Sequence, residues 1–118
     1  MREIKFRVLD GFSNWHFSND IGIGIFFDRL DYDFQEETLG QYTGLKDQKG
    51  IEIWEGDILK ATRETPTFDS RIKGYVEYSD AHACWVLVIK KGIEFLPLHQ
   101  LFDLEKVGNI HDNPEMIS

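Results

Sequence analysis

One stretch, residues 41–60, constrains the fold more than any other part of the sequence. Its glycines Gly44, Gly50 and Gly56 recur every six residues, and short runs that alternate apolar and polar side chains lie between them. Glycine adopts backbone conformations with positive φ at no steric cost, so each of these glycines marks a reversal of the chain. Residues 47–50, Asp-Gln-Lys-Gly, have the residue types of a tight turn. The stretch therefore predicts short strands joined by tight turns, and it carries no recognisable catalytic set.

The sequence after Gly56 predicts about five further short strands, at spacings typical of a small β-barrel. Residues 83–89 are apolar on both faces, as in a central strand that is covered on both sides. In residues 71–78 apolar and polar side chains alternate, which indicates a half-buried strand. Residues 62–70 contain Pro66 among Thr, Asp and Ser residues, which predicts a loop.

The first half of the chain also carries strand patterns. Residues 4–8 alternate apolar and basic side chains, and residues 21–27 alternate isoleucine with glycine before two phenylalanines. Both patterns predict strands, the second with a glycine face that lets another backbone or ring approach closely. A dinucleotide-binding fingerprint would need a third glycine where the chain has Phe27. We expect a mainly β protein in which a β-rich segment, residues 1–55, packs on a barrel of residues 56–118 as one compact unit.

Residues 28–37 form the most acidic segment, with five carboxylates against Arg29 alone. A calcium-binding EF-hand loop that starts at Asp31 would need glycine at its sixth position and glutamate at its twelfth. The chain has Glu36 and Tyr42 there. The segment is therefore interpreted as a solvated acidic face or loop.

Composition excludes several classes of protein. Apolar residues make up 42% of the chain and aromatic residues 14%, which argues against disorder. The net charge of −8 repels nucleic acid, and no basic face is visible. A single cysteine cannot form an internal disulfide, which fits a reducing compartment. No apolar run approaches the ~20 residues that a membrane-spanning helix needs, so we expect a cytoplasmic protein without a membrane partner.

The chemistry-bearing side chains form no recognisable reaction centre. Cys84 lies in an apolar strand, where a thiol is more often inert than reactive. Glu55 and Asp57 flank Gly56 and could act as a carboxylate pair, but turn residues that bond local backbone amides are the stronger interpretation. We therefore expect no catalytic residue, no metal and no cofactor. A zinc site needs closely spaced Cys and His ligands, and the four histidines are scattered: His16, His82, His99 and His111.

Two features predict contacts with other proteins. Trp15 and Trp54 lie near turns rather than in apolar runs, which makes them a candidate interaction surface, although burial is the commoner fate of tryptophan. A small sheet-rich domain also has open strand edges, which self-association often covers. We therefore expect a homo-oligomer.

The glycine-rich stretch also resembles a known family. Residues 41–47 are Gln-Tyr-Thr-Gly-Leu-Lys-Asp, and Gly50 and then Ile-Trp-Glu-Gly-Asp-Ile at residues 53–58 follow in the order typical of the YopX family. Further matches are Phe6-Arg7, residues 74–78 and residues 107–115. The residues assigned to this structural motif are Gln41, Tyr42, Thr43, Gly44, Leu45, Asp47, Gly50, Gly56, Asp57, Gly108, Asn109, Asn113 and Pro114.

The resemblance implies a phage or prophage protein of the bacterial host cell, whose C-terminal part is similar to an SH3-type β-barrel. The family has no established activity, so we expect a non-enzymatic accessory protein that binds a host or phage protein or assembles with itself. Two alternatives stay open. An enzyme has little support in the motifs, and a nucleic-acid-binding small barrel would need six basic residues to cluster in space: Lys60, Arg63, Arg71, Lys73, Lys90 and Lys91.

Overall fold

The computed structural model describes residues 3–64 and 69–117. It divides into two compact units, Met1–Gly44 and Leu45–Ser118. Part of the loop expected at residues 62–70 lies outside the described residues, and strands occupy the rest of it. None of the helices in the described part of the chain is long and apolar enough to cross a bilayer.

The sequence predicts a boundary between the two parts of the chain after residue 55. In the structure the boundary between the two units falls after Gly44. The reason is the turn at residues 47–50, which is bonded to the last strand of the second unit. The backbone amide of Gln48 donates to the carbonyl oxygen of Leu104 at 2.9 Å. The turn therefore belongs to the second unit, together with everything that follows it.

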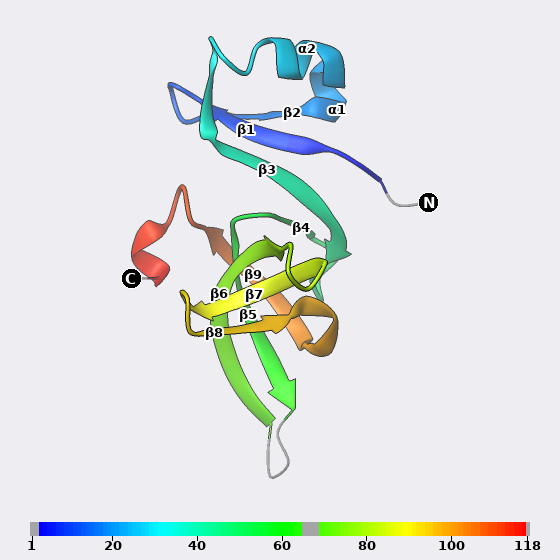
Figure 1. The fold of residues 1–118 in the computed structure, drawn as a ribbon, viewed down its shortest axis with the longest axis vertical. Coiled ribbons are helices and arrows are strands. Elements are labelled where there is room, and N and C mark those ends of the chain that lie inside the picture. Colours follow the sequence, from blue (N-terminus) through cyan, green and yellow to red (C-terminus); the bar gives the residue numbers. More distant parts are fainter. Residues whose placement is uncertain (1–2, 65–68, 118) are drawn as a thin grey trace. The chain divides into compact units, whose positions relative to one another are not determined.

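The first unit is built on an antiparallel arrangement of three strands with β1 in the middle (Figure 1). Val8 lies opposite His16 on one side, and Phe6 lies opposite Gln41 on the other. Thr38 accepts a hydrogen bond from the amide of Leu9 at 2.9 Å, where the register of the β1–β3 pair shifts. The strands are β1 (Phe6–Asp10), β2 (Trp15–Phe17) and β3 (Phe34–Lys46), whose last residues enter the second unit.

The prediction of a strand at residues 21–27 is wrong, because the chain forms two short helices there, α1 (Ser18–Ile21) and α2 (Ile23–Asp28). Gly22 joins them with a φ of +86°, which ends the extended pattern. The helix turns Phe26 into the core of this unit, where it is completely buried beside Val8. Burial of this ring outweighs the local alternation, since short apolar runs fit a strand or a helix equally well.

The second unit contains a five-stranded antiparallel sheet in the order β8-β7-β6-β5-β9, curled into a half-barrel (Figure 1). The 3₁₀ helix η1 (Leu98–Gln100) connects β8 to β9, and η2 (Pro114–Ile117) follows β9. The expectation of a mainly β protein is confirmed. The five strands of this sheet are β5 (Asp57–Glu64), β6 (Asp69–Ser79), β7 (Cys84–Lys90), β8 (Glu94–Pro97) and β9 (Phe102–Asn109), whereas β4 (Glu52–Trp54) pairs with β3.

Strand β7 is an interior strand between β6 and β8, although the middle strand of the sheet is β6 rather than the strand predicted to be central. Trp85 and Leu87 face the main core of the unit, where Leu87 is completely buried. Val86 and Val88 alternate with them and point to the other face, yet they are also buried. The side chains on both faces of β7 are therefore largely buried. Those on its outer face form the floor of a surface groove.

Candidate functional site

The turn that begins at Asp47 is tied to the last strand by one carboxylate. Asp47 accepts hydrogen bonds from the backbone amides of Lys49 and Ile51, both at 2.9 Å, and of Lys106 at 3.1 Å. Burial by itself would raise the pKa of this carboxyl, but the three amide bonds outweigh burial and hold the pKa below its ordinary value. Gly50 completes the turn with a φ of +83°. Asp47 therefore has a structural role.

Asp57 has a similar role in the next turn. Its side chain is fully buried and accepts a hydrogen bond from the amide of Trp54 at 2.7 Å. The ammonium group of Lys106 lies 3.2 Å from the same carboxylate oxygen. Gly56 makes the reversal with a φ of +89°. The interpretation of Asp57 as a turn residue that bonds a local amide is confirmed.

The motif near the C-terminus builds a third turn. The side-chain oxygen of Asn109 accepts hydrogen bonds from the amides of His111 at 3.0 Å and Asp112 at 2.9 Å. Asn113 accepts a hydrogen bond from the amide of Asn109 at 3.2 Å. A Cβ atom at Gly108 would lie 2.6 Å from the side-chain oxygen of Asn113, so a larger residue there would displace the side chain that caps this turn. The motif residues position η2 after β9.

The histidines and the cysteine are not brought together. His16 lies 2.9 Å from the carboxylate of Asp10, and this hydrogen bond, with amide bonds from Asn14 and Phe12, lowers the pKa of Asp10 to about 2. His82 contacts Ser79 at 3.0 Å. Among residues 3–64 and 69–117, no three His, Cys, Asp or Glu side chains are grouped as metal ligands would be.

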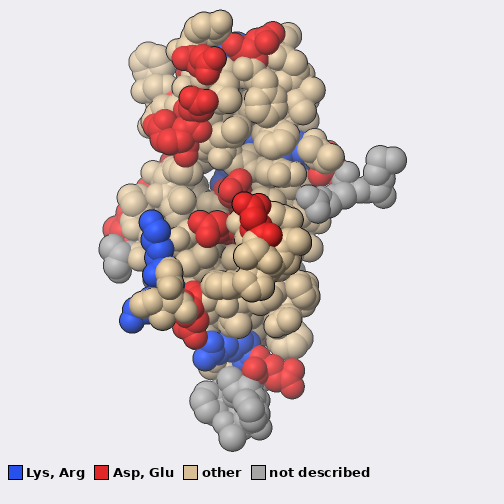
Figure 2. All heavy atoms as spheres, viewed as in Figure 1, with Lys and Arg blue, Asp and Glu red and all other residues tan. Residues whose placement is uncertain are grey.

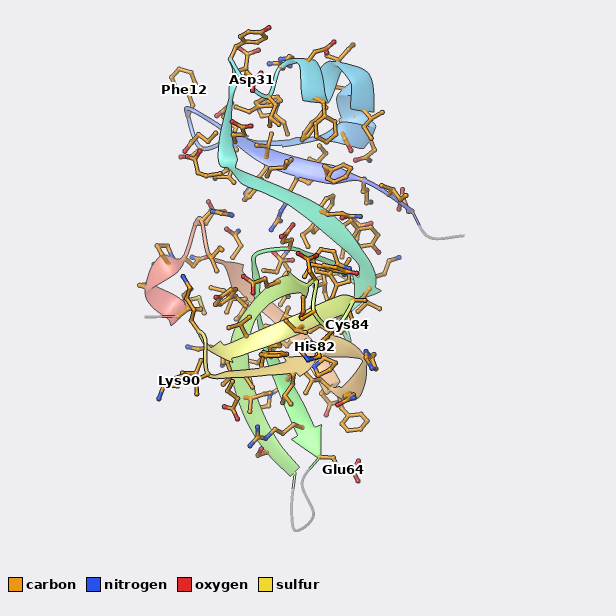
Figure 3. The ribbon with its side chains drawn as sticks, viewed as in Figure 1. Phe12, Asp31, Glu64, His82, Cys84 and Lys90 are labelled. Carbon is orange, nitrogen blue, oxygen red and sulfur yellow. The ribbon has the colours of Figure 1, made fainter. Side chains whose placement is uncertain are left out.

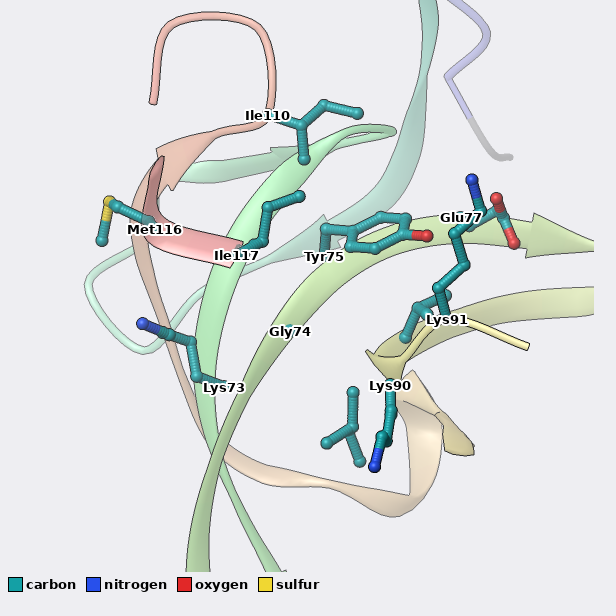
Figure 4. Close-up of a pocket in the computed structure, with 11 residues that line it drawn as sticks. Lys73, Gly74, Tyr75, Glu77, Lys90, Lys91, Ile110, Met116 and Ile117 are labelled. Atoms are coloured by element: carbon teal, nitrogen blue, oxygen red, sulfur yellow. The ribbon is translucent and has the colours of Figure 1, made fainter. Parts of the chain in front are cut away.

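An open groove of about 660 Å³ lies on the outer face of β6 and β7 in the second unit (Figure 4). Tyr75 and Val88, which are opposite each other in the β6–β7 register, form its floor. Figure 4 shows the ring of Tyr75 between Ile117 of η2 and the side chain of Glu77. The C-terminal helix thus provides one wall of the groove, and the β7–β8 turn provides the opposite end.

Gly74 allows the two strands to approach closely at this floor. A Cβ atom at this position would lie 2.3 Å from the carbonyl oxygen of Val88 and 3.0 Å from the side chain of Leu87. Backbone cannot yield to such a contact as a flexible side chain can, so residues other than glycine force β6 and β7 apart. The shape of the groove depends on this glycine.

A second hollow of about 350 Å³ continues the groove toward β8. It shares Tyr75, Glu77, Val88 and Lys91 with the first hollow and adds Phe95, which is 42% exposed. We call the two hollows together the outer groove. The groove combines an apolar floor, two aromatic rings and a rim of charged side chains, which suits a peptide segment better than a small enclosed ligand.

The rim of the outer groove is mainly basic although the chain has a net charge of −8. Lys73, Lys90 and Lys91 lie on it, with Glu77 and Glu94 as its acidic members. Burial, and secondly the charge of Glu77, raises the pKa of Tyr75, so its hydroxyl stays protonated and can donate a hydrogen bond. The rim can therefore hold carboxylates or other anions.

The two arginines of the nucleic-acid alternative are paired with acidic side chains, whereas Lys60 adjoins the rim. The guanidinium of Arg63 lies 3.1 Å from the carboxylate of Glu94, and that of Arg71 lies 3.1 Å from Glu105. Lys60 lies opposite Lys73 on neighbouring strands. Acidic side chains are spread over much of the visible face (Figure 2).

The two tryptophans chosen from the sequence lie outside the outer groove. Trp54 is only 4% exposed, and Trp15 is half-buried with the guanidinium carbon of Arg7 at 4.3 Å from its ring centre. Alternation in β6 already places Lys73, Tyr75 and Glu77 on its outer face. The local sequence pattern does not predict that η2 packs over that face, and for this reason the groove was not predicted from the sequence.

Fold and site together define a small two-unit β protein with an open, basic-rimmed groove on a curled sheet. The family model described as YopX protein matches residues 15–118, so the chain belongs to the YopX family. The resemblance drawn from the motifs is confirmed, with Phe6-Arg7 outside the matched residues. A search of curated proteins finds no match.

Proposed function

We propose that this chain is a non-enzymatic accessory protein of a phage or prophage, which works in the host cytoplasm through protein–protein contacts and assembles with itself. The observation that supports this proposal best is the outer groove. Its hollows of about 660 and 350 Å³ are continuous and open, and aromatic and aliphatic side chains line them. Grooves of this kind on a sheet accommodate peptide segments.

Exposed apolar side chains elsewhere in the second unit support the same proposal. Ile93 is 72% exposed and Phe102 is 50% exposed, close to the edge strands β8 and β9. Edge strands with exposed apolar side chains tend to be covered by a partner chain. The motif acids Asp47 and Asp57 are engaged in backbone hydrogen bonds, which supports a scaffold role over a catalytic one.

Size-exclusion chromatography with light scattering tests the proposal on the full chain at tens of micromolar. A mass above that of the 13.8 kDa chain, increasing with concentration, is the expected result. A single monomer mass over the whole range would remove self-assembly from the proposal.

A nucleic-acid-binding small barrel is the second candidate, because three lysines gather on one rim. Fluorescence anisotropy with labelled single- and double-stranded oligonucleotides at low salt separates the two candidates. Binding that weakens steeply with added salt would favour this second candidate. The paired arginines and the net charge of −8 lead us to expect no binding.

We also propose that the second unit is a partly open SH3-type barrel. Strand β9 pairs with β5, the first long strand of the unit, so the sheet curls back toward its own beginning. The 3₁₀ helix η1 makes the sharp connection before this last strand. An experimental structure in which this sheet is flat rather than curled would contradict this assignment.

A further inference from the structure

The first unit carries a surface that complements the outer groove in charge. We call residues 28–37 the acidic loop. Tyr32 at its turn is 83% exposed, and Asp31 beside it is exposed (Figure 3). The backbone amides of Tyr32 and Asp33 donate to the carbonyl oxygen of Arg29 at 3.2 and 3.0 Å, so the turn is held in shape. The acidic loop therefore presents an aromatic ring between carboxylates.

The base of the acidic loop is anchored in the core of the first unit. Phe34, which begins β3, is buried beside Phe26, and the guanidinium of Arg29 lies 2.8 Å from the carboxylate of Asp33. Glu36 and Glu37 follow on β3 and are exposed. Since the loop is already ordered, less conformational entropy is lost when it binds.

We propose that the acidic loop of one copy of this chain binds the outer groove of a second copy. The exposed ring of Tyr32 covers the apolar floor near Val88, and the carboxylate of Asp31 lies against the lysine rim at Lys90 and Lys91. This proposal rests on the self-assembly proposed above and names its interface. Because loop and groove are different surfaces, the contact closes either as a reciprocal dimer, in which each copy binds the loop of the other, or as rings or open chains.

Charge complementarity favours the second copy as the occupant. The chain has 21 acidic and 13 basic residues, so two copies repel each other unless matched patches meet. The outer groove is a basic-rimmed hollow, and residues 28–37 are the most acidic segment. Such pairing fixes the register of the contact and makes it sensitive to salt, while the buried aromatic ring gives most of the affinity.

The test is a pair of charge reversals studied by analytical ultracentrifugation of the full chain. Lys91→Glu changes the rim, and Asp31→Lys changes the loop. Each reversal is expected to weaken self-association by about tenfold or more, because an attraction becomes a repulsion at a partly desolvated contact. Lys46→Glu and Asp80→Lys make the same charge changes at exposed positions outside both surfaces and are expected to leave self-association unchanged.

A double variant that restores self-association distinguishes a direct contact between the two surfaces from a general effect of net charge. The variant that carries both Lys91→Glu and Asp31→Lys is expected to recover most of the wild-type association, since the two signs are exchanged. Tyr32→Ala is expected to weaken association without changing its salt dependence. Circular dichroism of each variant checks that the fold is intact, which the exposure of all these side chains favours.

The outcomes distinguish this proposal from the one on which it rests. If the wild-type chain is a monomer, self-assembly and this interface both fail. If it assembles and Lys91→Glu behaves as Lys46→Glu does, self-assembly stands and another occupant or surface must be sought. If both single reversals weaken self-association and the double variant does not recover it, the loop-to-groove contact is also overturned.

Discussion

The ammonium group of Lys106 lies 3.2 Å from the carboxylate of Asp57, whose side chain is completely buried. These two residues lie on the neighbouring strands β9 and β5 of the half-barrel. The backbone amide of Lys106 also donates to Asp47, so one residue of β9 is bonded to the first two of the three turns of the family motif. The motif is thus a device that fixes the last strand.

Replacing Asp57 by alanine is expected to destabilise the second unit by about 3–5 kcal/mol, as is typical when one partner of a buried charged pair is removed. The amide of Trp54 loses its acceptor, and Lys106 loses its counter-charge. Urea unfolding monitored by circular dichroism measures the change. Glu105→Ala, next to Lys106 on β9, breaks the exposed pair with Arg71 of β6 and is expected to cost about 1 kcal/mol or less.

Acid is expected to destabilise the first unit as the pH falls from about 4 toward 2. The pKa of Asp10 is about 2 in the folded chain and 3.8 ordinarily, so the unfolded chain takes up the proton first. The stabilisation by Asp10 is therefore fully present above its ordinary pKa and is lost below it. Asp10→Asn should flatten the dependence of the unfolding free energy on pH in this window, while Asp80→Asn in an exposed turn should leave it unchanged.

Protonation of Asp47 is expected to destabilise the second unit as the pH falls, as protonation of Asp10 destabilises the first. Its pKa is also below the ordinary value, so its stabilisation too is lost as the pH falls. Asp47→Ala removes an acceptor from three backbone amides and is expected to lower the unfolding free energy by about 2–3 kcal/mol at neutral pH. Hydrogen exchange at the amides of Ile51 and Lys106 checks the mechanism, and unchanged protection of both would contradict it.

Gly74→Ala is expected to destabilise the second unit by about 3 kcal/mol, in the range of overpacked core sites. The added Cβ would lie 2.3 Å from the carbonyl oxygen of Val88. Thermal unfolding measures the cost. Gly11→Ala is the matched control, because no atom lies within 4 Å of the added Cβ there. A Gly74→Ala protein as stable as the wild type would show that β6 does not approach β7 so closely.

A pair of alanine substitutions tests the helix at residues 23–28. In the helix Phe26 is completely buried and Ile25 is 58% exposed. Phe26→Ala is therefore expected to cost about 3–5 kcal/mol, and Ile25→Ala is expected to cost under about 1 kcal/mol. The strand pattern predicts that the isoleucines share one face, so an equal or greater cost of Ile25→Ala would favour the strand.

Local sequence determined much of the second unit. The turn at Asp47 and Gly50, the reversal at Gly56 and the doubly covered strand β7 all follow from residues within a few positions of each other. Turn chemistry and side-chain alternation are properties of short segments, so they can be recognised without knowledge of the fold. The family resemblance was carried by the same segments.

The tertiary structure decided the rest. The helix at Phe26, the pair formed by Asp57 and Lys106 and the return of Ile117 over Tyr75 each depend on segments that are distant in the sequence. Burial and ion pairing stabilise contacts between residues that the chain topology brings together. These contacts cannot be predicted from local sequence patterns. The sequence therefore established a glycine-punctuated β protein of the YopX family, and folding alone created the outer groove.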